Sequence, residues 1–467
     1  MMTTRATIRT RGDLAGRDAL VLGLARSGVA LARYLVDAGA RVTVYDRRAP
    51  DDLADAVAAL DGRAVRLALG VDAAAAVALV EDATLIFTSP SVSPHFPTTE
   101  AWLREALVRA LERGAELVSE VELFLRLTRA RTIGVTGTKG KTTTTALIGA
   151  MLDAAEIPHE VGGNIGRPLV ELADDLGPED WAVLELSELQ LPTISRGTDV
   201  AVTTNILEDH LDRHGTVEAY RAVKARLTEL APPGARVILN RDDPASRELG
   251  ERLRTVPTWF GVRDGVEARV DAGWVVLEGE PLLAVVDVPL PGEHMLGNVL
   301  AAALAAAEAG ASHPQIAAAV RAFGGVPHRL EPIAERGGIR YVNDSQATIP
   351  IAAIAALRAF APSPIVLISG GQGKGLDLAA FADEVAARAR AAVLMGETAP
   401  ELAAAIDGRV PVERAGSMDE AVALARRRAQ PGDVVLLAPA ATSFDMFSDY
   451  AARGDAFRRA VDAELSA

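Results

Sequence analysis

The chain has 467 residues, of which 49% are hydrophobic and 24% charged, a balance typical of globular proteins and too apolar for a disordered one. At about 100–200 residues per domain, this length suggests about three domains. Lys and Arg total 48 while Asp and Glu total 63, so the net charge of −15 disfavours nucleic acids and anionic membranes as partners. The absence of cysteine excludes disulfides, thiolate metal sites and a cysteine nucleophile.

The first residues carry charge but lack the apolar core of a secretory signal. The longest uncharged apolar stretches lie around Met295–Ala307 and Ile349–Leu357, and both are shorter than the roughly 20 residues that span a bilayer. We therefore expect a soluble, cytoplasmic protein.

Short runs of Val, Ile and Leu alternate with alanine-rich helical stretches along the chain. Such runs, bounded by Gly, Ser, Asp or Asn, are typical of parallel strands buried on both faces. Helices between them form βαβ units, so we expect the α/β class. Examples of the runs are Ala19–Leu22, Arg41–Tyr45, Leu85–Thr88, Thr132–Val135, Ala182–Leu186, Val200–Thr203, Val237–Leu239, Ile365–Ile368 and Val434–Leu437.

A strand–loop–helix pattern starts afresh three times, each time with a glycine-rich loop, at Gly23–Gly28, Gly134–Lys141 and Gly370–Gly375. We expect the domain boundaries between these segments near Ser119 and Gly325. The expected domains are an N-terminal Rossmann-like domain (1–119), a central P-loop ATPase-like domain with a parallel sheet (120–325) and a C-terminal Rossmann-like domain (326–467).

Between Arg254 and Leu290 the pattern changes to short alternating pieces with Gly and Pro. Alternation of this kind is typical of antiparallel strands with one solvated face. We therefore expect a small antiparallel insert in the central domain.

The first loop, Gly23–Gly28, reads GLARSG and stands between a strand and a helix. It is similar to G-x-G-x-x-G with Ala25 at the second glycine, and Asp46 ends the next strand at about the spacing of a ribose-binding acid. This pattern predicts a nucleotide or pyrophosphate at the helix N-terminus. A tight turn that binds nothing remains the alternative for this loop alone.

The second loop follows strand Thr132–Val135 and reads TGTKGKTT before a helix. Backbone N–H groups of such a loop surround phosphates, Lys141 reaches the β and γ oxygens, and the Thr142 hydroxyl can bind Mg²⁺. The spacing departs from the strict Walker pattern, because Val135 stands at its first glycine. A strand followed by GKT nevertheless favours a phosphate site over a solvated basic turn.

Two further residues follow this loop on neighbouring strands. Glu185 stands near the end of an apolar strand, where a carboxylate is costly unless it is paired or bound to a metal. His210 comes just past strand Val200–Thr203, where α/β sheets place ligands. Oxygen ligands with one imidazole suit Mg²⁺ or Mn²⁺, so we expect a metal here.

Taken together, a series of motifs resembles the Mur ligase family, the ATP-dependent amino-acid-adding enzymes of peptidoglycan precursor synthesis. The motifs occur in the family's order over nearly the whole chain. They are TGTKGKTTTT (136–145), GGNIG (162–166), ELSELQL (185–191), TNILEDHLDRH (204–214), Lys224 in YRAVK, GEHMLGN (292–298), PHRLE (327–331), NDSQAT (343–348), GGQGKG (370–375) and PAATSFDMF (439–447).

The resemblance is greatest to the member that joins glutamate to UDP-N-acetylmuramoyl-L-alanine. It implies an ADP-forming ligase, acting as a monomer, with an acyl-phosphate intermediate, two Mg²⁺ sites and a carbamylated Lys224. D-Glutamate is the leading amino acid, and a related branch that adds L-glutamate is the alternative. A remote alternative is an NAD-dependent oxidoreductase, which leaves the GKT loop, His210 and Lys224 unexplained.

The resemblance also implies the site residues. Those expected at the UDP-sugar are Gly23, Ala25, Arg26, Ser27, Asp46, Arg47, Asn164, Ser187 and Gln190. Those expected at ATP are Gly137, Thr138, Lys139, Gly140, Lys141, Thr142, Thr143, Asn298, Arg329 and Asp344. The expected metal ligands are Thr142, Glu185, His210 and Lys224. The expected catalytic residues are Lys141, Glu185, His210 and Lys224. Those expected at glutamate are Gln346, Thr348, Lys374, Ser443 and Phe444.

Four positions depart from the family's commoner pattern. Ser91 replaces the usual glycine of the SPG turn. Met295 stands where GxHNxxN has its first Asn, and Glu188 replaces a serine in ELSS. Gln346 replaces the lysine of DSKAT, and an amide cannot supply that lysine's charge to a glutamate carboxylate.

Overall fold

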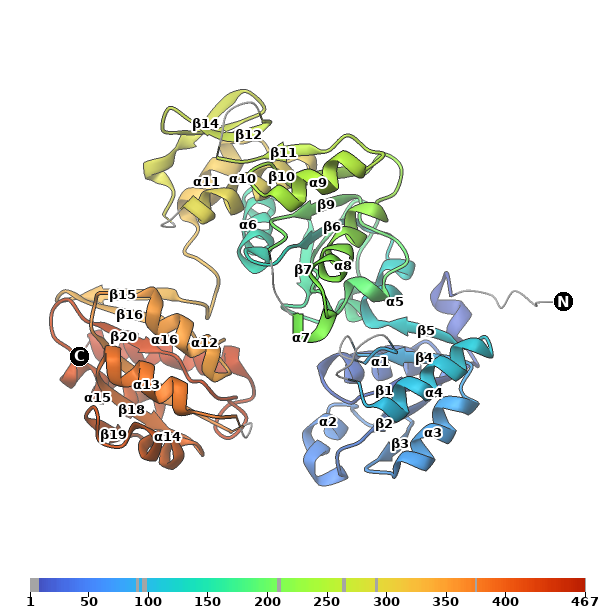
Figure 1. Ribbon diagram of the computed structural model, residues 1–467, viewed down its shortest axis with the longest axis horizontal. Coiled ribbons are helices and arrows are strands. Elements are labelled where there is room, and N and C mark those ends of the chain that lie inside the picture. Colours follow the sequence, from blue (N-terminus) through green and yellow to red (C-terminus); the bar gives the residue numbers. More distant parts are fainter. Residues whose placement is uncertain are drawn as a thin grey trace. The chain divides into compact units, whose positions relative to one another are not determined.

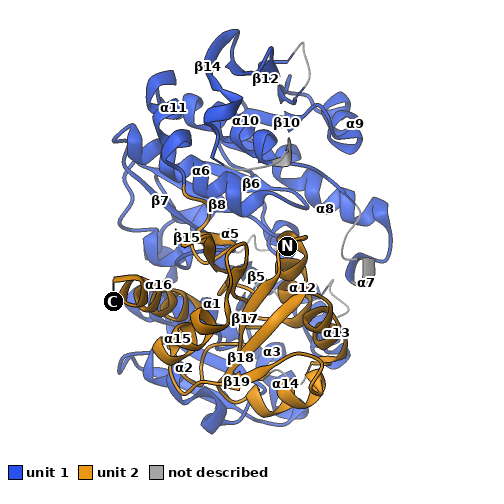
Figure 2. Cartoon of the chain, turned by 90° about the vertical axis from the view of Figure 1, so that its left-hand side faces the viewer, with its two compact units in different colours: residues 1–323 blue, residues 324–467 orange. Residues whose placement is uncertain are grey.

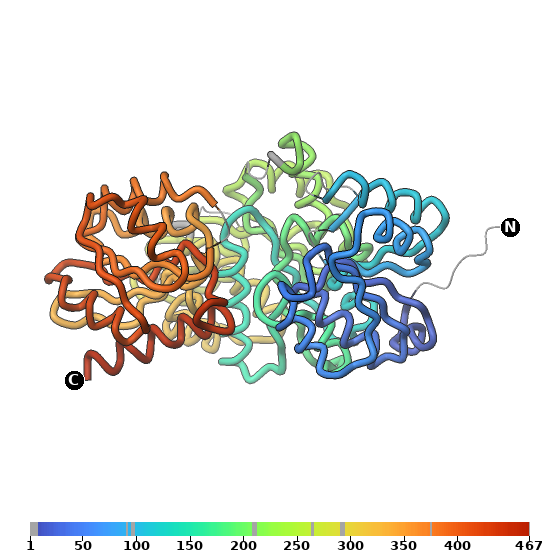
Figure 3. The backbone as a smooth tube through the Cα atoms, turned by 90° about the horizontal axis from the view of Figure 1, so that it is seen from below, coloured from blue at the N-terminus to red at the C-terminus, as the bar shows by residue number. Residues whose placement is uncertain are grey.

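The computed structural model describes residues 8–89, 92–94, 99–207, 211–262, 266–289, 293–373 and 376–466. Within these residues the strands form three sheets (Figure 1). The sheets follow one another along the chain, whose course the sequence colours of the backbone tube trace (Figure 3). The chain divides into two compact units, Met1–Phe323 and Gly324–Ala467 (Figure 2). The first unit holds the N-terminal and central sheets, and the second holds the C-terminal sheet.

The N-terminal sheet is parallel and has the strand order β3-β2-β1-β4-β5. Its strands are β1 (Asp18–Leu22), β2 (Arg41–Asp46), β3 (Val65–Leu69), β4 (Leu85–Thr88) and β5 (Glu116–Ser119). The helices of this region are η1 (Arg11–Leu14), α1 (Arg26–Asp37), η2 (Pro50–Leu53), α2 (Ala54–Ala58), α3 (Ala73–Asp82), α4 (Ala101–Glu112) and α5 (Glu120–Leu127).

Alternate residues of the central strands enter cores on opposite faces of this sheet. Val21 of β1 packs with α1 and α5, whereas its neighbours Leu20 and Leu22 pack with α3 and α4. A strand covered on both faces needs apolar side chains at every position, which is why β1 and β4 read as continuous apolar runs.

The central sheet has the order β14-β13-β12-β11-β10-β9-β6-β8-β7. Its strands are β6 (Arg131–Thr136), β7 (His159–Gly163), β8 (Trp181–Glu185), β9 (Val200–Thr203), β10 (Arg236–Asn240), β11 (Thr258–Phe260), β12 (Ala268–Asp271), β13 (Trp274–Leu277) and β14 (Glu280–Ala284). The helices are α6 (Lys141–Ala154), η3 (Leu169–Leu172), η4 (Leu191–Thr193), α7 (Leu211–His214), α8 (Val217–Glu229), α9 (Pro244–Arg252), η5 (Val285–Asp287), α10 (Glu293–Glu308) and α11 (His313–Ala322).

The predicted antiparallel insert corresponds to β12, β13 and β14, which pair antiparallel to one another. These strands extend the central sheet instead of forming a separate one, because β11 and β12 continue the parallel ladder outward from β10. The parallel part, from β12 to β7, carries the predicted phosphate loop.

The C-terminal sheet has the order β15-β16-β20-β17-β18-β19, parallel apart from the edge strand β15. Its strands are β15 (Glu331–Arg336), β16 (Ile339–Asn343), β17 (Ile365–Gly370), β18 (Ala389–Met395), β19 (Val412–Arg414) and β20 (Val434–Leu437). The helices are α12 (Pro350–Ala359), α13 (Ala379–Arg388), α14 (Ala399–Ile406), α15 (Met418–Arg428) and α16 (Tyr450–Ser466). One core lies between the sheet and α12–α14, and another between the sheet and α15 and α16.

Among the helices built from described residues, none combines the length and the hydropathy needed to cross a membrane. The parallel strands of each sheet end at a common edge, where open α/β sheets bind their ligands. Predicted site residues follow such strand ends in each of the three sheets, whereas Lys224 and Asn298 lie on helices and Arg329 precedes a strand.

Candidate functional site

The loop between β6 and α6 is shaped by two glycines with positive φ. At Gly137 (φ 144°) a Cβ would lie 2.0 Å from the Thr204 hydroxyl oxygen, and at Gly140 (φ 85°) a Cβ would lie 2.3 Å from Asn298 Oδ1. A side chain at either position would therefore collide with a neighbouring element. Asn298 is a predicted ATP residue, and α10 brings it directly against this loop.

The segment after β9 holds the loop in place. The Thr138 N–H donates to the carbonyl of Asn205 at 2.9 Å, and the Lys139 N–H donates to the Asn205 side-chain oxygen at 2.9 Å. The Thr204 hydroxyl donates to the carbonyl of Lys139 at 2.6 Å. A loop fixed in this way presents its remaining N–H groups in a preformed arrangement, as phosphate binding requires.

Lys141 is the first residue of α6, and its Nζ donates to the carbonyls of Gly137 and Thr138, each at 3.0 Å. The ammonium group thus lies over the loop. Phosphate oxygens, being charged acceptors, form stronger hydrogen bonds with an ammonium than neutral carbonyls do. Thr142 follows at the helix N-terminus and is 8% exposed.

Glu185 ends β8 beside the loop and is 1% exposed. Its Oε1 accepts a hydrogen bond from Asn164 Nδ2 at 2.8 Å, while its Oε2 has no hydrogen-bond partner among the described residues. Gly163 brings the two together, because a Cβ there would lie 2.4 Å from the Glu185 carbonyl oxygen. A buried carboxylate oxygen without a donor is costly unless a cation binds it, so Glu185 fits a metal ligand.

Lys224 lies on α8 and is 0% exposed, so it is not an ordinary exposed helix lysine. Its Nζ lies 5.4 Å from the centre of the Tyr220 ring. The Tyr220 hydroxyl is 3.0 Å from the Thr138 hydroxyl, which connects Lys224 through Tyr220 to the phosphate loop.

The predicted ligand His210 lies outside the described residues. Within those residues, no group of three or more His, Cys, Asp or Glu side chains is arranged to hold a metal.

A cavity of about 390 Å³ adjoins the phosphate loop. Lys139, Gly140 and Asn298 line it together with residues that the sequence analysis missed: Thr204, Asn205, Leu207, Asn240, Asp242, Phe260, Gly261, Val262 and Gly297. One of these residues, Asn240, could have been noticed in the sequence as a polar residue at a strand end, because it ends β10 beside β9 at the same sheet edge. An aromatic ring with amide and carboxylate groups suits a nucleoside next to the phosphates.

A second cavity, of about 420 Å³, opens at the end of the N-terminal sheet. Of the predicted UDP-sugar residues, Gly23, Ala25, Asp46 and Arg47 line it, whereas Arg26 and Ser27 begin α1 and are not part of its described lining. Asn164, Ser187 and Gln190 lie in the loops that follow β7 and β8.

Asp46 is held by several donors. Its oxygens accept hydrogen bonds from the N–H of Leu24 at 2.8 Å and from the guanidinium of Arg48 at 2.9 and 3.1 Å. Burial alone would raise the pKa of Asp46, but these hydrogen bonds outweigh it and lower the pKa below its ordinary value. The carboxylate therefore stays ionised and fixes the first turn of the loop.

Residues of the central domain complete this cavity. Leu189 and Arg213 line it, and Arg213 Nη1 donates to Glu188 Oε1 at 3.0 Å. Gln190 shapes the turn that carries Glu188, because its Oε1 accepts hydrogen bonds from the N–H and the hydroxyl of Ser187 at 2.9 and 3.0 Å. Glu188, which replaces the family's serine, thus orients an arginine at the cavity wall.

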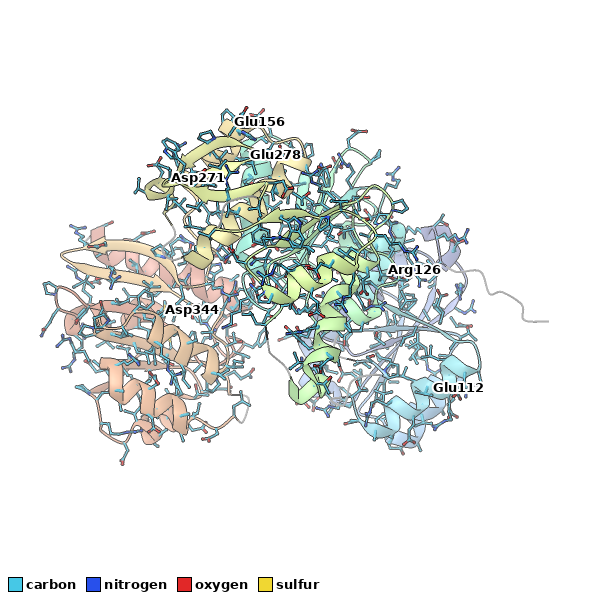
Figure 4. All side chains as sticks on the ribbon, turned by 45° about the horizontal axis from the view of Figure 1, so that its top comes forward. Glu112, Arg126, Glu156, Asp271, Glu278 and Asp344 are labelled. Atoms are coloured by element: carbon cyan, nitrogen blue, oxygen red, sulfur yellow. The ribbon has the colours of Figure 1, made fainter. Side chains whose placement is uncertain are left out.

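In the second unit, Asp344 follows β16 and accepts a hydrogen bond from the N–H of Leu330 at 3.0 Å (Figure 4). Burial raises the pKa of Asp344 to about 6, partly offset by that hydrogen bond and by the positive charge of Arg329. The predicted ATP residues Arg329 and Asp344 therefore lie near one another.

Four of the predicted glutamate residues, Gln346, Thr348, Ser443 and Phe444, occupy the loops that follow β16 and β20. Gln346 Nε2 donates to the carbonyl of Pro327 at 3.2 Å, and Thr348 is half-buried. Ser443 is 2% exposed, whereas Phe444 is 64% exposed. Lys374 lies outside the described residues.

Comparison with known proteins accounts for this arrangement. Three family profiles match the chain: Mur ligase MurD-like, N-terminal domain, at residues 17–118; Mur ligase middle domain, at 135–306; and Mur ligase, glutamate ligase domain, at 328–441. A UDP-N-acetylmuramoylalanine–D-glutamate ligase of Solibacter usitatus is 41% identical and covers 96% of this chain and 98% of its own length. The protein of the same name from Symbiobacterium thermophilum is 41% identical and covers 95% and 98%.

The chain belongs to the Mur ligase family. It is therefore an ATP-dependent, ADP-forming amide ligase of peptidoglycan precursor synthesis, and Mur ligases use ATP with Mg²⁺. Among solved structures, the UDP-N-acetylmuramate–alanine ligase MurC of Thermotoga maritima has the same fold, with a TM-score of 0.54 at 19% identity, covering 96% of this chain and 99% of its own.

Proposed function

We propose that this chain joins D-glutamate to UDP-N-acetylmuramoyl-L-alanine at the expense of ATP. The observation that carries the proposal is the 41% identity, over 96% of the chain, to a ligase named for that reaction. The glycine-shaped phosphate loop beside Glu185 and the separate cavity at the Gly23 loop support it, because the reaction needs one site for ATP and another for a nucleotide sugar.

The chemistry requires no covalent enzyme intermediate. The carboxylate of the alanyl group attacks the γ-phosphorus of ATP, ADP leaves, and an acyl phosphate forms. The neutral amine of glutamate then attacks the acyl carbon, and the tetrahedral intermediate expels phosphate to leave the amide.

The residues of the chain would bind, orient and stabilise charge in these steps. Lys141 and the N–H groups of its loop would bind the β- and γ-phosphates and stabilise the charge that develops on the transferred phosphoryl group. Mg²⁺ would neutralise phosphate charge when bound, held by Thr142, Glu185, His210 and a carbamylated Lys224, in two sites. Asn164, which donates to Glu185 Oε1, would keep the other carboxylate oxygen turned toward the cation.

The other assignments follow the same reasoning. The cavity lined by Asn240 and Phe260 would take the adenosine of ATP. In the second unit, Arg329 and Asp344 are the residues proposed to bind ATP. The cavity at Gly23 and Asp46 would take the UDP moiety, and the loops at Gln346, Thr348, Lys374, Ser443 and Phe444 would take glutamate.

We further propose that the ligase acts in the cytoplasm as a monomer, with domains at 1–119, 120–325 and 326–467. Light scattering on the purified protein should give a mass near 48.9 kDa. A mass of twice that value at micromolar concentration would reject the monomer.

The decisive assay measures phosphate release by the purified protein with ATP, Mg²⁺, UDP-N-acetylmuramoyl-L-alanine and either enantiomer of glutamate. We expect release only when the nucleotide sugar and D-glutamate are both present. Ligation of L-glutamate alone would replace the proposal with the L-adding branch, and release independent of the amino acid would reject ligation altogether.

A further inference from the structure

Arg453 on α16 is a buried cation that the assignments above leave without a role. It is 1% exposed and is one of the largest fully buried side chains among the described residues. Its Nε donates to the Ser345 hydroxyl at 3.0 Å and its Nη2 to the Ser345 carbonyl at 3.0 Å. Its Nη1 donates to the carbonyls of Ala441 and Thr442 at 3.1 and 2.9 Å.

These acceptors belong to loops that follow neighbouring strands. Ser345 comes after β16, and Thr442 comes after β20, which lies between β16 and β17 in the sheet. Thr442 in turn exchanges backbone hydrogen bonds of 2.9 and 3.0 Å with Gln372, which follows β17. One guanidinium therefore connects the loops after three adjacent strands.

The atoms around this connection are closely packed, so that a side chain at Gly371 would not fit. At Gly371, a Cβ would lie 2.0 Å from the Thr442 carbonyl oxygen and 3.0 Å from Arg453 Nη1. Lysine at 453 would keep the charge but lose the planar fork that reaches two loops at once.

The loops held by Arg453 carry the proposed glutamate residues. Gln346 is adjacent to Ser345, and Ser443 is adjacent to Thr442. Gln346 is a neutral amide where the family's pattern has a lysine, so the loop after β16 lacks the cation that a second carboxylate would need.

Arg453 supplies a positive charge at this place. Among the described residues, Arg453 has four hydrogen-bond acceptors, and none of them is a carboxylate. Burial lowers the pKa of Arg453 to about 10, and the negative charge of Asp445 partly opposes that shift. The group therefore remains protonated at neutral pH. Charges act over longer distances in a poorly solvated interior than in water.

We propose that Arg453 is the positioning residue of the amino-acid site. Arg453 sets the spacing of the three loops, and its buried charge favours a dianionic amino acid over one with a neutral side chain. This inference rests on the proposed glutamate site. Glutamate with its amine deprotonated for attack carries two negative charges, whereas glutamine carries one.

The test compares the KM for D-glutamate with the inhibition constant of D-glutamine, measured as a competitor, in the wild type, Arg453→Lys and Arg453→Met. In Arg453→Met we expect the preference for glutamate over glutamine to fall about tenfold, the effect of one charge acting over roughly 12 Å at an effective dielectric constant near 20. Arg453→Lys should weaken both ligands while keeping their ratio within about threefold. The KM for ATP should change little in either variant.

Arg458→Met is the matched control. Arg458 lies on the same helix and forms an ion pair with Glu331 on the edge strand β15, so its loss should leave the ratio unchanged. Equal weakening of both ligands in Arg453→Met, or a collapsed ratio in Arg453→Lys, would overturn the inference. If Arg453→Met does not fold, a collapsed glutamate-to-glutamine ratio in Arg453→Lys would still overturn the inference. A wild type that does not ligate glutamate would instead reject the proposed function.

Discussion

Lys141 is held over its own loop by two neutral carbonyl acceptors, which a triphosphate would replace with charged oxygens. We predict that Lys141→Ala lowers kcat by about 10²–10³-fold, because a charged donor at developing phosphoryl charge is worth several kcal/mol in an active site. Steady-state phosphate release measures this effect, with Lys139→Ala as a milder comparison because Lys139 is exposed. Turnover within tenfold of the wild type would remove Lys141 from the phosphate site.

Lys224 is completely buried beside Tyr220, which links it to the phosphate loop. A carbamate there would offer oxygen ligands where an amine cannot. We predict that Lys224→Ala is inactive and is partly rescued by millimolar acetate, which restores an oxygen donor. Lys224→Arg keeps a positive charge but cannot be carbamylated, so it should be inactive and unresponsive to acetate. An active Lys224→Arg enzyme would contradict the carbamate.

Glu188 pairs with Arg213 at the wall of the first cavity, where a diphosphate would compete for the same guanidinium. We predict that Glu188→Gln tightens UDP binding about two- to fivefold, since the Arg213 side chain is 23% exposed and a solvent-screened ion pair is worth up to about 1 kcal/mol. Calorimetric titration with UDP measures this change. Glu100→Gln is the control, because its partner Arg47 is 74% exposed, and it should change binding less. Weaker UDP binding by Glu188→Gln would mean that the pair holds Arg213 in its binding pose.

The candidate site shows which residues a sequence can reveal. Glu185 and Asn164 could be expected to meet, because glycine-flanked ends of parallel strands share one sheet edge. Asn240 and Phe260 escaped notice, since each is common at strand ends and only the register of β10 and β11 places both in the cavity. Arg453 was undetectable for another reason: it lies in an amphipathic helix, where arginine is usually solvated.

Among the elements, α5 begins with a carboxylate that is buried at the helix N-terminus. Glu120 is 1% exposed, and its Oε1 accepts a hydrogen bond from the N–H of Val170 at 2.8 Å. Burial raises the pKa of Glu120 from 4.5 to about 7, an increase that this hydrogen bond only partly offsets. The folded state therefore binds a proton that the unfolded state releases between pH 4.5 and 7.

The sign of the pH dependence follows from this difference. The stability that Glu120 contributes is fully present below pH 4.5 and is lost as the pH rises through about 7. Glu120→Gln keeps an acceptor for Val170 but cannot ionise. We predict that its free energy of unfolding matches the wild type near pH 4.5 and exceeds it by about 2–3 kcal/mol at pH 8. Urea unfolding at both pH values measures the difference, and a constant difference would contradict it.

The strands differ in how readily their sequences reveal them. Val200–Thr203 and Val434–Leu437 agree with β9 and β20 because central strands covered on both faces must be apolar throughout. Strand β18, Ala389–Met395, begins with an alanine- and arginine-rich segment of high helix propensity, and only its pairing with β17 makes it a strand. The extension of the central sheet by β12 is likewise set by pairing with β11 and leaves no local signal.

At the scale of the whole molecule, the described hydrophobic cores do not correspond one to one with the three sheets. The C-terminal sheet has its own cores on both faces. By contrast, a single core joins the N-terminal and central sheets, because Leu31 of α1, Phe124 of α5 and Leu184 of β8 belong to the same cluster. A chain cut after Phe323 keeps intact each core formed by the described residues, whereas a cut after Ser119 divides one.

This difference predicts how fragments of the chain behave. Residues 324–467 should fold alone, unfold cooperatively on heating and bind little of the hydrophobic dye ANS, and residues 1–323 should do the same. Residues 1–119 lack the α5 and central-sheet side chains that cover one face of their sheet, so this fragment should bind ANS strongly or aggregate. Circular dichroism and ANS fluorescence distinguish these outcomes. A well-folded 1–119 fragment that does not bind ANS would show that the proposed N-terminal domain folds without its neighbour and that the shared core contributes little to stability.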